Sequence, residues 1–327
     1  MKKDLSVECL RGLACVLLVT YHVIGDNSEQ GLRVAADSYL RYLNDSLVYL
    51  RMPLFTFLSG YVYSLRPVKS NPIGFLVKKV RRLIIPMLVV GTLYIGIQHL
   101  VPGTNSTYSF ITLYSFYPVA HFWFLEALLL IFVVLVPMEF SGILKRKGSF
   151  FLVLLFFSGI SLSQVKTTTF FAVNGAVYLM PYFLLGVGIH RFNLDKIGPG
   201  VKSLILIVAL ISILFSQLGL SGVVEIDLAR RSLVAFLLGA AGVVSLFLFR
   251  FENKFLAAIG EYSYTIYLFH VFSAAAVRII MVRLGVTSLE LHLFLGIIAG
   301  IAAPILLEKL LSKYSVARLL LFGKSAR

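Results

Sequence analysis

Two ionisable side chains, Arg11 and His22, lie in the first long apolar segment of the sequence, eleven positions apart. At about 100° and 1.5 Å per residue, a helix places them on one face, about 16 Å apart along its axis. That length is close to the reach of an extended pantetheine arm. A coenzyme A thioester could hold its phosphates at Arg11 with its acyl carbon beside His22. The structural alternative is an Arg11 that reaches the interface and a His22 hydrogen-bonded to a neighbouring helix.

A second basic feature, Lys78-Lys79-Val-Arg81-Arg82, lies at the start of the third apolar segment. Lys78 and Arg82 are four residues apart and would share one face of a helix. Such a cluster could grip the phosphates and adenosine of a soluble donor. It could equally be a topology anchor beside anionic lipid.

The second and fourth apolar segments carry Arg51 with Ser59, and His121 with Glu126. A buried Arg51 needs an anionic partner, and Glu126 is expected at a similar depth. Glu126 could therefore pair with Arg51, or take part in the chemistry directly. His121 and Glu126 differ by about 140° around a helix, so one of the two could be structural.

In the ninth apolar segment, the spacing places Ser263, Tyr267 and His270 on one helical stripe. This stripe could belong to the site, or form a hydrogen-bonded seam between two helices. The other histidines, His99, His190 and His292, fall at segment ends, and no group has the spacing of metal ligands. We therefore predict no metal.

The elements that hold these residues are predicted from composition and hydropathy. With 59% hydrophobic and 14% charged residues, the chain is too apolar for a water-soluble globule. It is predicted to be all-α and polytopic. Spans of about twenty residues number about ten, at 5–25, 46–65, 82–101, 117–137, 149–165, 170–190, 201–220, 232–250, 259–281 and 289–311.

Orientation follows from the basic residues. Alternating the loops between faces puts 22 of the 30 Lys and Arg residues on one face, which the positive-inside rule makes cytoplasmic. Both termini are then cytoplasmic. The net charge of +15 is explained this way, and nucleic acid is not expected as a partner. We expect one membrane-embedded domain over 1–327, with no soluble domain and no P-loop for an ATP-driven pump.

Four segments, in order, resemble the acyltransferase 3 family of bacterial membrane proteins, which transfer acyl groups to surface glycans. Arg11 with His22 is similar to the family's first-helix Arg-x10-His signature. The other three are Met52-Pro53-Leu54-Phe55 with Leu58-Ser59-Gly60-Tyr61, His121-Phe-Trp123-Phe-Leu, and Tyr262-Ser263-Tyr264-Thr-Ile-Tyr267-Leu-Phe-His270. The family's Arg-x-x-x-Arg pattern is met here as Lys78-x-x-x-Arg82. Lysine keeps the charge but loses bidentate phosphate geometry.

The resemblance implies a membrane O-acyltransferase of the bacterial inner membrane, most simply an O-acetyltransferase. It would use cytoplasmic acyl-CoA as donor substrate, with no permanently bound cofactor, and a hydroxyl of an envelope or exported polysaccharide or its lipid-linked precursor as acceptor. His22 and Glu126 would be catalytic, with His22 as general base or acyl carrier. Arg11, Lys78 and Arg82 would bind the donor. Acceptor binding or structural support would come from Arg51, Ser59, His121, Trp123, Tyr267 and His270.

Two other classes of function fit the same residues. A polytopic transporter or flippase could line its substrate path with Arg11, His22, Arg51 and Glu126, and would turn over without acyl-CoA. A non-catalytic scaffold of a glycan-assembly complex would not need His22. Membrane lipid is a partner in every case, and the sequence leaves open a homo-oligomer or a glycan-assembly partner.

Overall fold

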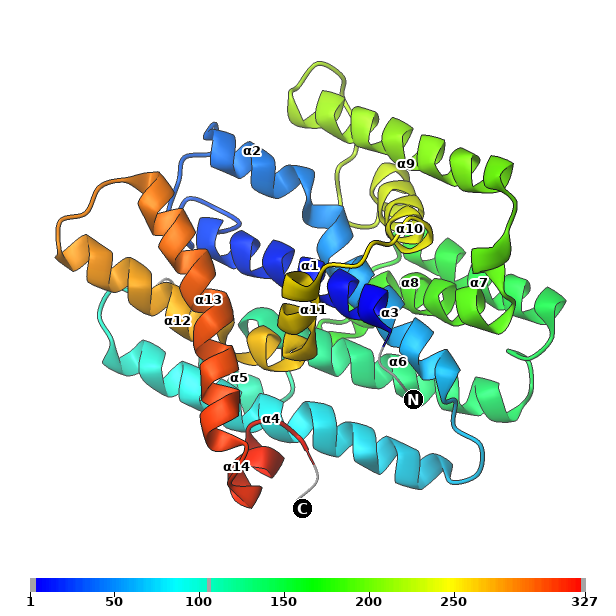
Figure 1. The fold of residues 1–327 in the computed structure, drawn as a ribbon, viewed down its shortest axis with the longest axis horizontal. Helices are drawn as coiled ribbons and strands as arrows, with labels where there is room; N and C mark the ends of the chain where they lie inside the picture. Colours follow the sequence, from blue (N-terminus) through cyan, green and yellow to red (C-terminus); the bar gives the residue numbers. More distant parts are fainter. Residues whose placement is uncertain (1–3, 105–106, 325–327) are drawn as a thin grey trace. The chain divides into compact units, whose positions relative to one another are not determined.

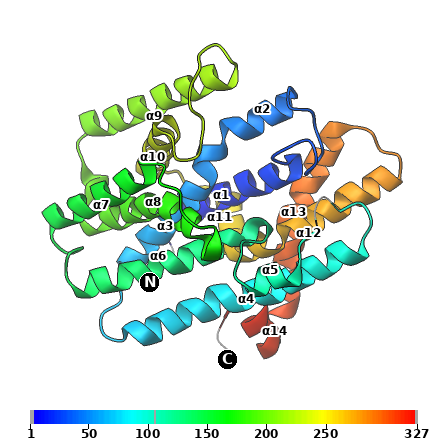
Figure 2. The same cartoon turned by 180° about the vertical axis from the view of Figure 1, so that it is seen from behind.

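The computed structural model describes residues 4–104 and 107–324, which form helices and connecting turns with no β-strand among them. Figures 1 and 2 show the helices from opposite sides, coloured along the sequence. Their contacts divide the chain into two compact units. Among the described residues, unit 1 comprises 4–47, 81–104, 107–122 and 252–324. Unit 2 comprises Val48–Val80 and Trp123–Phe251. The predicted all-α class is confirmed.

Unit 1 is built around the first helix, which packs against α11, α12 and α13. α1 and α11 approach so closely that a side chain at Gly12 would strike the Leu256 carbonyl, and one at Gly260 would strike the Glu8 carbonyl. Small residues at such a crossing allow two membrane helices to pack backbone to backbone. The helices of this unit are α1 (Leu5–Ile24), α2 (Tyr39–Ser46), the part of α4 (Pro72–Leu100) from Arg81 onward, α5 (Phe110–Tyr114), η1 (Ala120–Phe122), α11 (Lys254–Glu261), α12 (Ser263–Arg283), α13 (Leu289–Leu311) and α14 (Ser315–Leu320).

Unit 2 repeats this kind of crossing between α3 and α8. Gly60 faces the Phe183 carbonyl and Gly186 faces the Phe57 carbonyl, each too close to admit a side chain. Its helices are α3 (Val48–Leu65), the start of α4, α6 (Trp123–Phe140), α7 (Lys147–Leu162), η2 (Phe170–Ala172), α8 (Val173–Arg191), η3 (Leu194–Lys196), α9 (Pro199–Leu220) and α10 (Leu233–Leu248).

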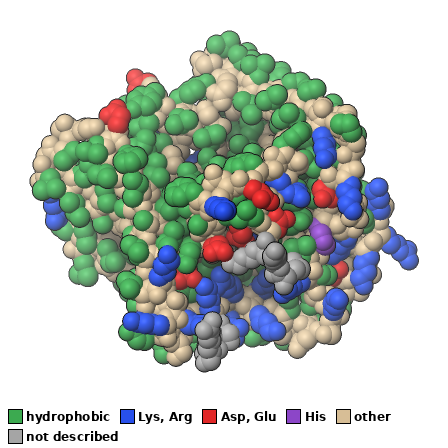
Figure 3. Space-filling model, viewed as in Figure 1, with side chains coloured by type: hydrophobic (Ala, Val, Ile, Leu, Met, Phe, Trp, Pro, Cys, Tyr) green, Lys and Arg blue, Asp and Glu red, His purple; other side chains and the backbone are tan. Residues whose placement is uncertain are grey.

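Seven helices in the described residues are long and apolar enough to cross a membrane. They are Leu5–Ile24, Pro72–Leu100, Ala120–Phe140, Phe170–Arg191, Pro199–Leu220, Ser263–Arg283 and Leu289–Leu311. Apolar side chains cover much of the surface in Figure 3, as lipid-facing helices require. The chain is therefore a multi-pass membrane protein. The other three predicted spans coincide with α3, α7 and α10, which are not among the seven, and the number ten stays a prediction.

Helix ends differ from the predicted ones in two places. The predicted span 259–281 is interrupted at Tyr262, where α11 ends and α12 begins in a new direction. The predicted span 82–101 is the second part of α4, which already begins at Pro72. Lysines and arginines in the first three turns of α4 lower the local hydropathy, so a hydropathy window ends there although the helix continues.

Candidate functional site

Three histidines of unit 1 meet at one point. His22 comes from the last turn of α1, His270 from the middle of α12 and His121 from η1. The ring centroids of His22 and His270 are 4.8 Å apart, those of His121 and His270 are 5.1 Å apart, and those of His22 and His121 are 5.9 Å apart. We call these residues the histidine cluster. His270 and His121 are buried, and His22 is half-buried at the rim.

The turn after α1 fixes the position of His22. Gly25 ends the helix with φ at +95°, a conformation that suits glycine, and its carbonyl accepts hydrogen bonds from Arg41 Nη1 and Asn44 Nδ2. The chain therefore turns back immediately after His22. This leaves the imidazole at the end of the helix rather than within it.

Hydrogen bonds determine which nitrogens of His22 and His270 carry protons. His270 Nδ1 lies 2.8 Å from the Ile266 carbonyl, which can only accept, so Nδ1 donates and Nε2 keeps its lone pair. His22 Nδ1 lies 3.0 Å from the Leu18 carbonyl and 3.1 Å from His270 Nε2, two acceptors, so it also donates. The lone pair of His22 therefore resides on Nε2.

His121 is held by its backbone rather than by its ring. The Tyr267 hydroxyl donates to the His121 carbonyl, so the seam predicted for the Tyr267–His270 stripe exists and joins α12 to η1. The His121 side chain is only 5% exposed, and neither ring nitrogen has a hydrogen-bond partner of good geometry among the described residues. Buried polar atoms without partners are rare and suggest a bound group at the site.

A cavity of about 330 Å³ within unit 1 opens beside His22. Its wall includes the aromatic rings of Tyr94 and Phe272 and the polar side chains of Gln98 and Thr104. Apolar walls with a few convergent polar groups are typical of small-molecule sites. The cavity can therefore bring a substrate to the His22 imidazole.

The predicted donor-binding residues of unit 1 lie toward the other end of α1. Arg11 forms a 2.8 Å ion pair with Glu8, one turn earlier on the same helix. The Arg82 guanidinium stacks on the Tyr264 ring, 4.0 Å from its centroid, and donates to the Phe322 carbonyl. Arginine carries five N–H donors, so these contacts leave capacity for a phosphate. Lys78 is exposed and lies in the part of α4 that belongs to unit 2.

α1 is a single helix, as the spacing of Arg11 and His22 requires. Cys15 and Leu18 lie between them on the same face, and both are buried. Cys15 Sγ is directed at the Ser263 carbonyl at the start of α12. Arg11 is not among the residues that line the cavity at His22. In this conformation the cavity therefore ends at the histidine cluster.

Arg51, Ser59, Trp123 and Glu126 lie in unit 2. Arg51 and Glu126 are both buried, but the ion pairs formed among the described residues do not include one between them. Glu126 Oε2 has no hydrogen-bond partner there. The Ser59 hydroxyl donates to the Phe55 carbonyl of its own helix at 2.8 Å, and the Trp123 ring packs on Gly175.

Several residues at the two ends of α1 were not singled out by sequence reasoning. Glu8 had a signal, because an acid three residues before Arg11 on one helix predicts the pair that forms. Tyr264 lies inside a motif quoted for other residues. Tyr94, Gln98 and Phe272 had no signal in the sequence, because a single aromatic or amide residue in an apolar span does not reveal which helix it faces.

These features define a multi-pass helical membrane protein with a buried histidine site at the end of its first helix. Residues 4–309 match the acyltransferase 3 family, described as an acyltransferase domain, and the chain belongs to that family. Comparison with curated proteins and with solved structures gives no significant match. The chain is thus a membrane acyltransferase, and the predicted resemblance is confirmed.

Proposed function

We propose that this acyltransferase moves an acetyl group from cytoplasmic acyl-CoA to a hydroxyl of an envelope or exported polysaccharide, or of its lipid-linked precursor. The observation that carries the proposal is the geometry of the histidine cluster. His22 Nδ1 lies 3.1 Å from His270 Nε2, which assigns the His22 lone pair to Nε2, and the imidazole borders a substrate-sized cavity.

His22 Nε2 can use this lone pair in two ways. As a general base it takes the proton of the acceptor hydroxyl while that oxygen attacks the thioester carbonyl, and the leaving thiolate then recovers the proton as coenzyme A thiol. As a nucleophile it takes the acyl group itself and expels coenzyme A as the thiolate; the acceptor hydroxyl then attacks the acyl-imidazolium, which frees His22, and the hydroxyl proton passes to the thiolate. In both routes His22 becomes positively charged, and His270 Nε2 stabilises that charge by accepting from Nδ1.

The acyl-CoA phosphates are proposed to bind Arg11 and Arg82, with Lys78 beside them on α4. Their position toward the N-terminal end of α1, about 16 Å from His22 along the helix, supports a donor whose arm extends through the membrane. Because Cys15 and Leu18 are buried between these ends, donor binding must separate the elements around α1. Glu126 stays a predicted catalytic residue and Arg51 a predicted supporting residue, both within unit 2.

The proposed topology places this reaction across the bacterial inner membrane. We infer that α3, α7 and α10 also cross it, which gives ten spans with both termini cytoplasmic. The basic residues support this assignment, because alternating loops then carry 22 and 8 of the 30 Lys and Arg residues.

The test uses cells lacking the gene, complemented with wild type, His22→Ala or His99→Ala at matched expression, and measures acetyl released from their envelope glycans. His99 is an exposed histidine of unit 1 that does not line the cavity. We expect wild type and His99→Ala to restore acetylation, and His22→Ala to lower it by about 10²-fold or more.

Each other outcome changes the conclusion. Equal restoration by His22→Ala would remove His22 as catalyst and favour a scaffold. Restoration by none of the proteins would reject acetyl transfer and point to another acyl group or to transport. Purified protein then decides between these two, because an acyltransferase releases coenzyme A thiol from acyl-CoA and a transporter does not.

A further inference from the structure

The cavity at His22 adjoins a second cavity of about 340 Å³, also within unit 1. The two share Leu32, Arg278, Ile279 and His292 in their walls, and we call the adjoining pair the hollow. One part of this hollow is bounded by His22. The other is bounded by Arg33, Arg278 and Arg283.

The arginines at this end are unusual for their place in the chain. They follow α1 or end α12, on the face that the charge count assigns to the outside, where few basic residues are expected. Arg33 and Arg278 lie close enough for their charges to repel. Positive charges that line a hollow, where topology does not require them, make that hollow attractive to an anion.

The acidic residues near this end, Asp26, Glu29, Asp37, Asp45 and Glu290, are not among the residues that line the hollow. Asp45 pairs with Arg41 at 3.2 Å, and Glu290 accepts from Tyr39 and Ser288. Arg278 donates to the Gly103 carbonyl, a neutral group that leaves its charge uncompensated.

The walls between the arginines and His22 suit a sugar. Tyr94 and Phe272 offer aromatic faces, while Gln30, Gln98 and Thr104 offer polar groups for hydroxyls. Arg278 follows His270 by eight residues on α12, about 12 Å along the axis. An anion at Arg278 would therefore be well separated from the hydroxyl that reacts at His22.

We propose that the acceptor is an anionic saccharide whose phosphate or carboxylate binds Arg278 and Arg283 while a hydroxyl on another part of the molecule reaches His22. This rests on the proposed acyl transfer for its biological meaning, but the anion site itself does not. Guanidinium groups bind phosphate and carboxylate through paired N–H donors, so charge and shape both select such an acceptor.

The test is calorimetric titration of the purified full chain in detergent, with coenzyme A in excess to fill the donor end. The probes are glucose 1-phosphate, glucuronate and the uncharged methyl glucoside. The proteins are wild type, Arg278→Gln, Arg283→Gln and Arg230→Gln. Arg283 is exposed, so its loss should not impair folding, and Arg230 is an exposed arginine of unit 2 that serves as the matched control.

We expect wild type and Arg230→Gln to bind glucose 1-phosphate about tenfold or more tightly than methyl glucoside. Arg278→Gln and Arg283→Gln should each lower the affinity for glucose 1-phosphate about tenfold, which is the contribution of a hydrogen bond to a charged group. The affinity for methyl glucoside should not change. Glucuronate binding like the phosphate would indicate a carboxylate acceptor, and weak glucuronate binding a phosphate acceptor.

Equal affinity for charged and uncharged probes, or unchanged affinity in both arginine variants, would overturn the proposal. So would binding that disappears in Arg11→Gln, because the probe would then occupy the other end of α1. The titration involves no acyl transfer. A failure of the proposed function therefore appears in the acetylation assay, and a failure of the anion site appears here.

Discussion

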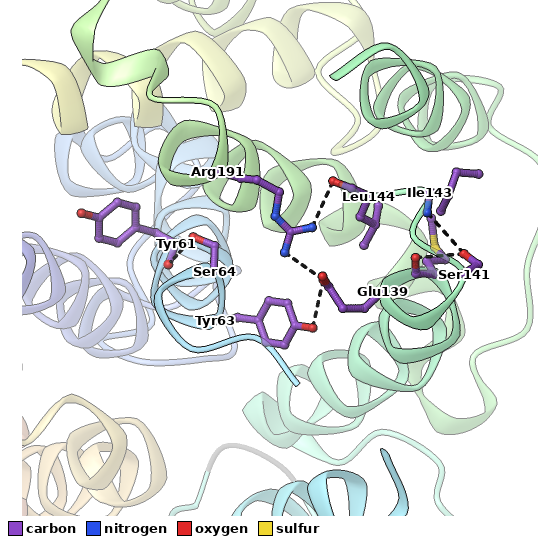
Figure 4. A network of polar contacts seen from close by, with 9 residues as sticks. Tyr61, Tyr63, Ser64, Glu139, Ser141, Ile143, Leu144 and Arg191 are labelled. Carbon is purple, nitrogen blue, oxygen red and sulfur yellow. Dashed lines mark hydrogen bonds and ion pairs between the residues drawn. The ribbon is translucent and has the colours of Figure 1, made fainter. Parts of the chain in front are cut away.

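The molecule contains two buried polar clusters that differ in how well they are satisfied. In unit 2, Glu139 Oε2 accepts from Arg191 Nη2 at 2.8 Å and from the Tyr63 hydroxyl at 3.2 Å, and Arg191 Nη1 donates to the Leu144 carbonyl (Figure 4). We call this group the Glu139 cluster. In unit 1, the histidine cluster leaves both ring nitrogens of His121 without partners of good geometry and opens onto a cavity.

This difference separates a structural group from a reactive one. Opposite charges in the Glu139 cluster offset each other, and three helical segments are joined by the bonds. In the histidine cluster, His22 and His270 bond to each other and to the carbonyls of Leu18 and Ile266, which are neutral groups, and this arrangement assigns the lone pair of His22 to Nε2. Burial of polar groups is common to both. The candidate site differs because ring nitrogens of His121 lack hydrogen-bond partners of good geometry and because His22 borders a cavity.

The largest expected effect tests the proton arrangement of the histidine cluster. His270→Leu removes the acceptor for His22 Nδ1, and we expect kcat for acyl transfer to fall about 10²-fold while KM for acyl-CoA is unchanged. His270→Gln, whose amide oxygen can accept the same proton, should keep most of the rate. Steady-state kinetics of the purified variants measure kcat and KM separately. Equal losses in both variants would mean that His270 only packs.

The next effect tests the Glu139 cluster as a structural group. Glu139→Ala leaves Arg191 buried without its carboxylate, which should cost about 3–5 kcal/mol of folding free energy. We expect a lower unfolding temperature in detergent, with the rate per folded molecule retained. Glu225→Ala, an exposed acid of the same unit, is the control. A normal unfolding temperature with lost activity would move Glu139 into the site.

The sequence predicted the class of fold better than the contacts of individual residues. Hydropathy predicts apolar helices well, and the eleven-residue spacing of Arg11 and His22 survives because α1 is continuous. The break at Tyr262 was not predicted, because it depends on the close packing of Gly260 against α1. The short helices α2, α5 and α14 are below the length that a hydropathy window detects.

The partners of each polar residue were harder to predict. Hydropathy gives the depth of a residue in the membrane but not the helix that it faces. Arg51 and Glu126 were expected at similar depth, but depth alone did not decide whether they pair with each other or Glu126 takes part in the chemistry. His22 and His270 were treated as separate features, each with a helix-seam alternative. The seam between α1 and α12 exists, since His22 Nδ1 lies 3.1 Å from His270 Nε2, and the catalytic role of His22 stays a prediction.

A smaller effect concerns the ring nitrogens of His121, which lack hydrogen-bond partners of good geometry. His121→Phe keeps the ring but removes buried polar atoms that lack partners, so we expect a gain of about 1–3 kcal/mol in stability. If those nitrogens bind the acceptor, the transfer rate falls about tenfold at the same time. Unfolding temperature and rate are measured together, with His99→Phe as control. A lower unfolding temperature together with a lower rate would show that the ring nitrogens of His121 form hydrogen bonds that stabilise the fold.

The smallest effect concerns Ser59, which the family resemblance places among the supporting residues. Its hydroxyl donates to the Phe55 carbonyl within α3, as the Thr56 hydroxyl does to Met52, so both are satisfied by their own helix. We expect Ser59→Ala and the matched Thr56→Val to change the transfer rate less than about twofold and stability by about 0.5 kcal/mol or less. A tenfold loss of rate in Ser59→Ala alone, with acyl-CoA affinity unchanged, would mean that this hydroxyl leaves Phe55 and binds the acceptor. Polar groups satisfied in the resting state would then be as reactive as unsatisfied ones, and the distinction between the two clusters would not hold.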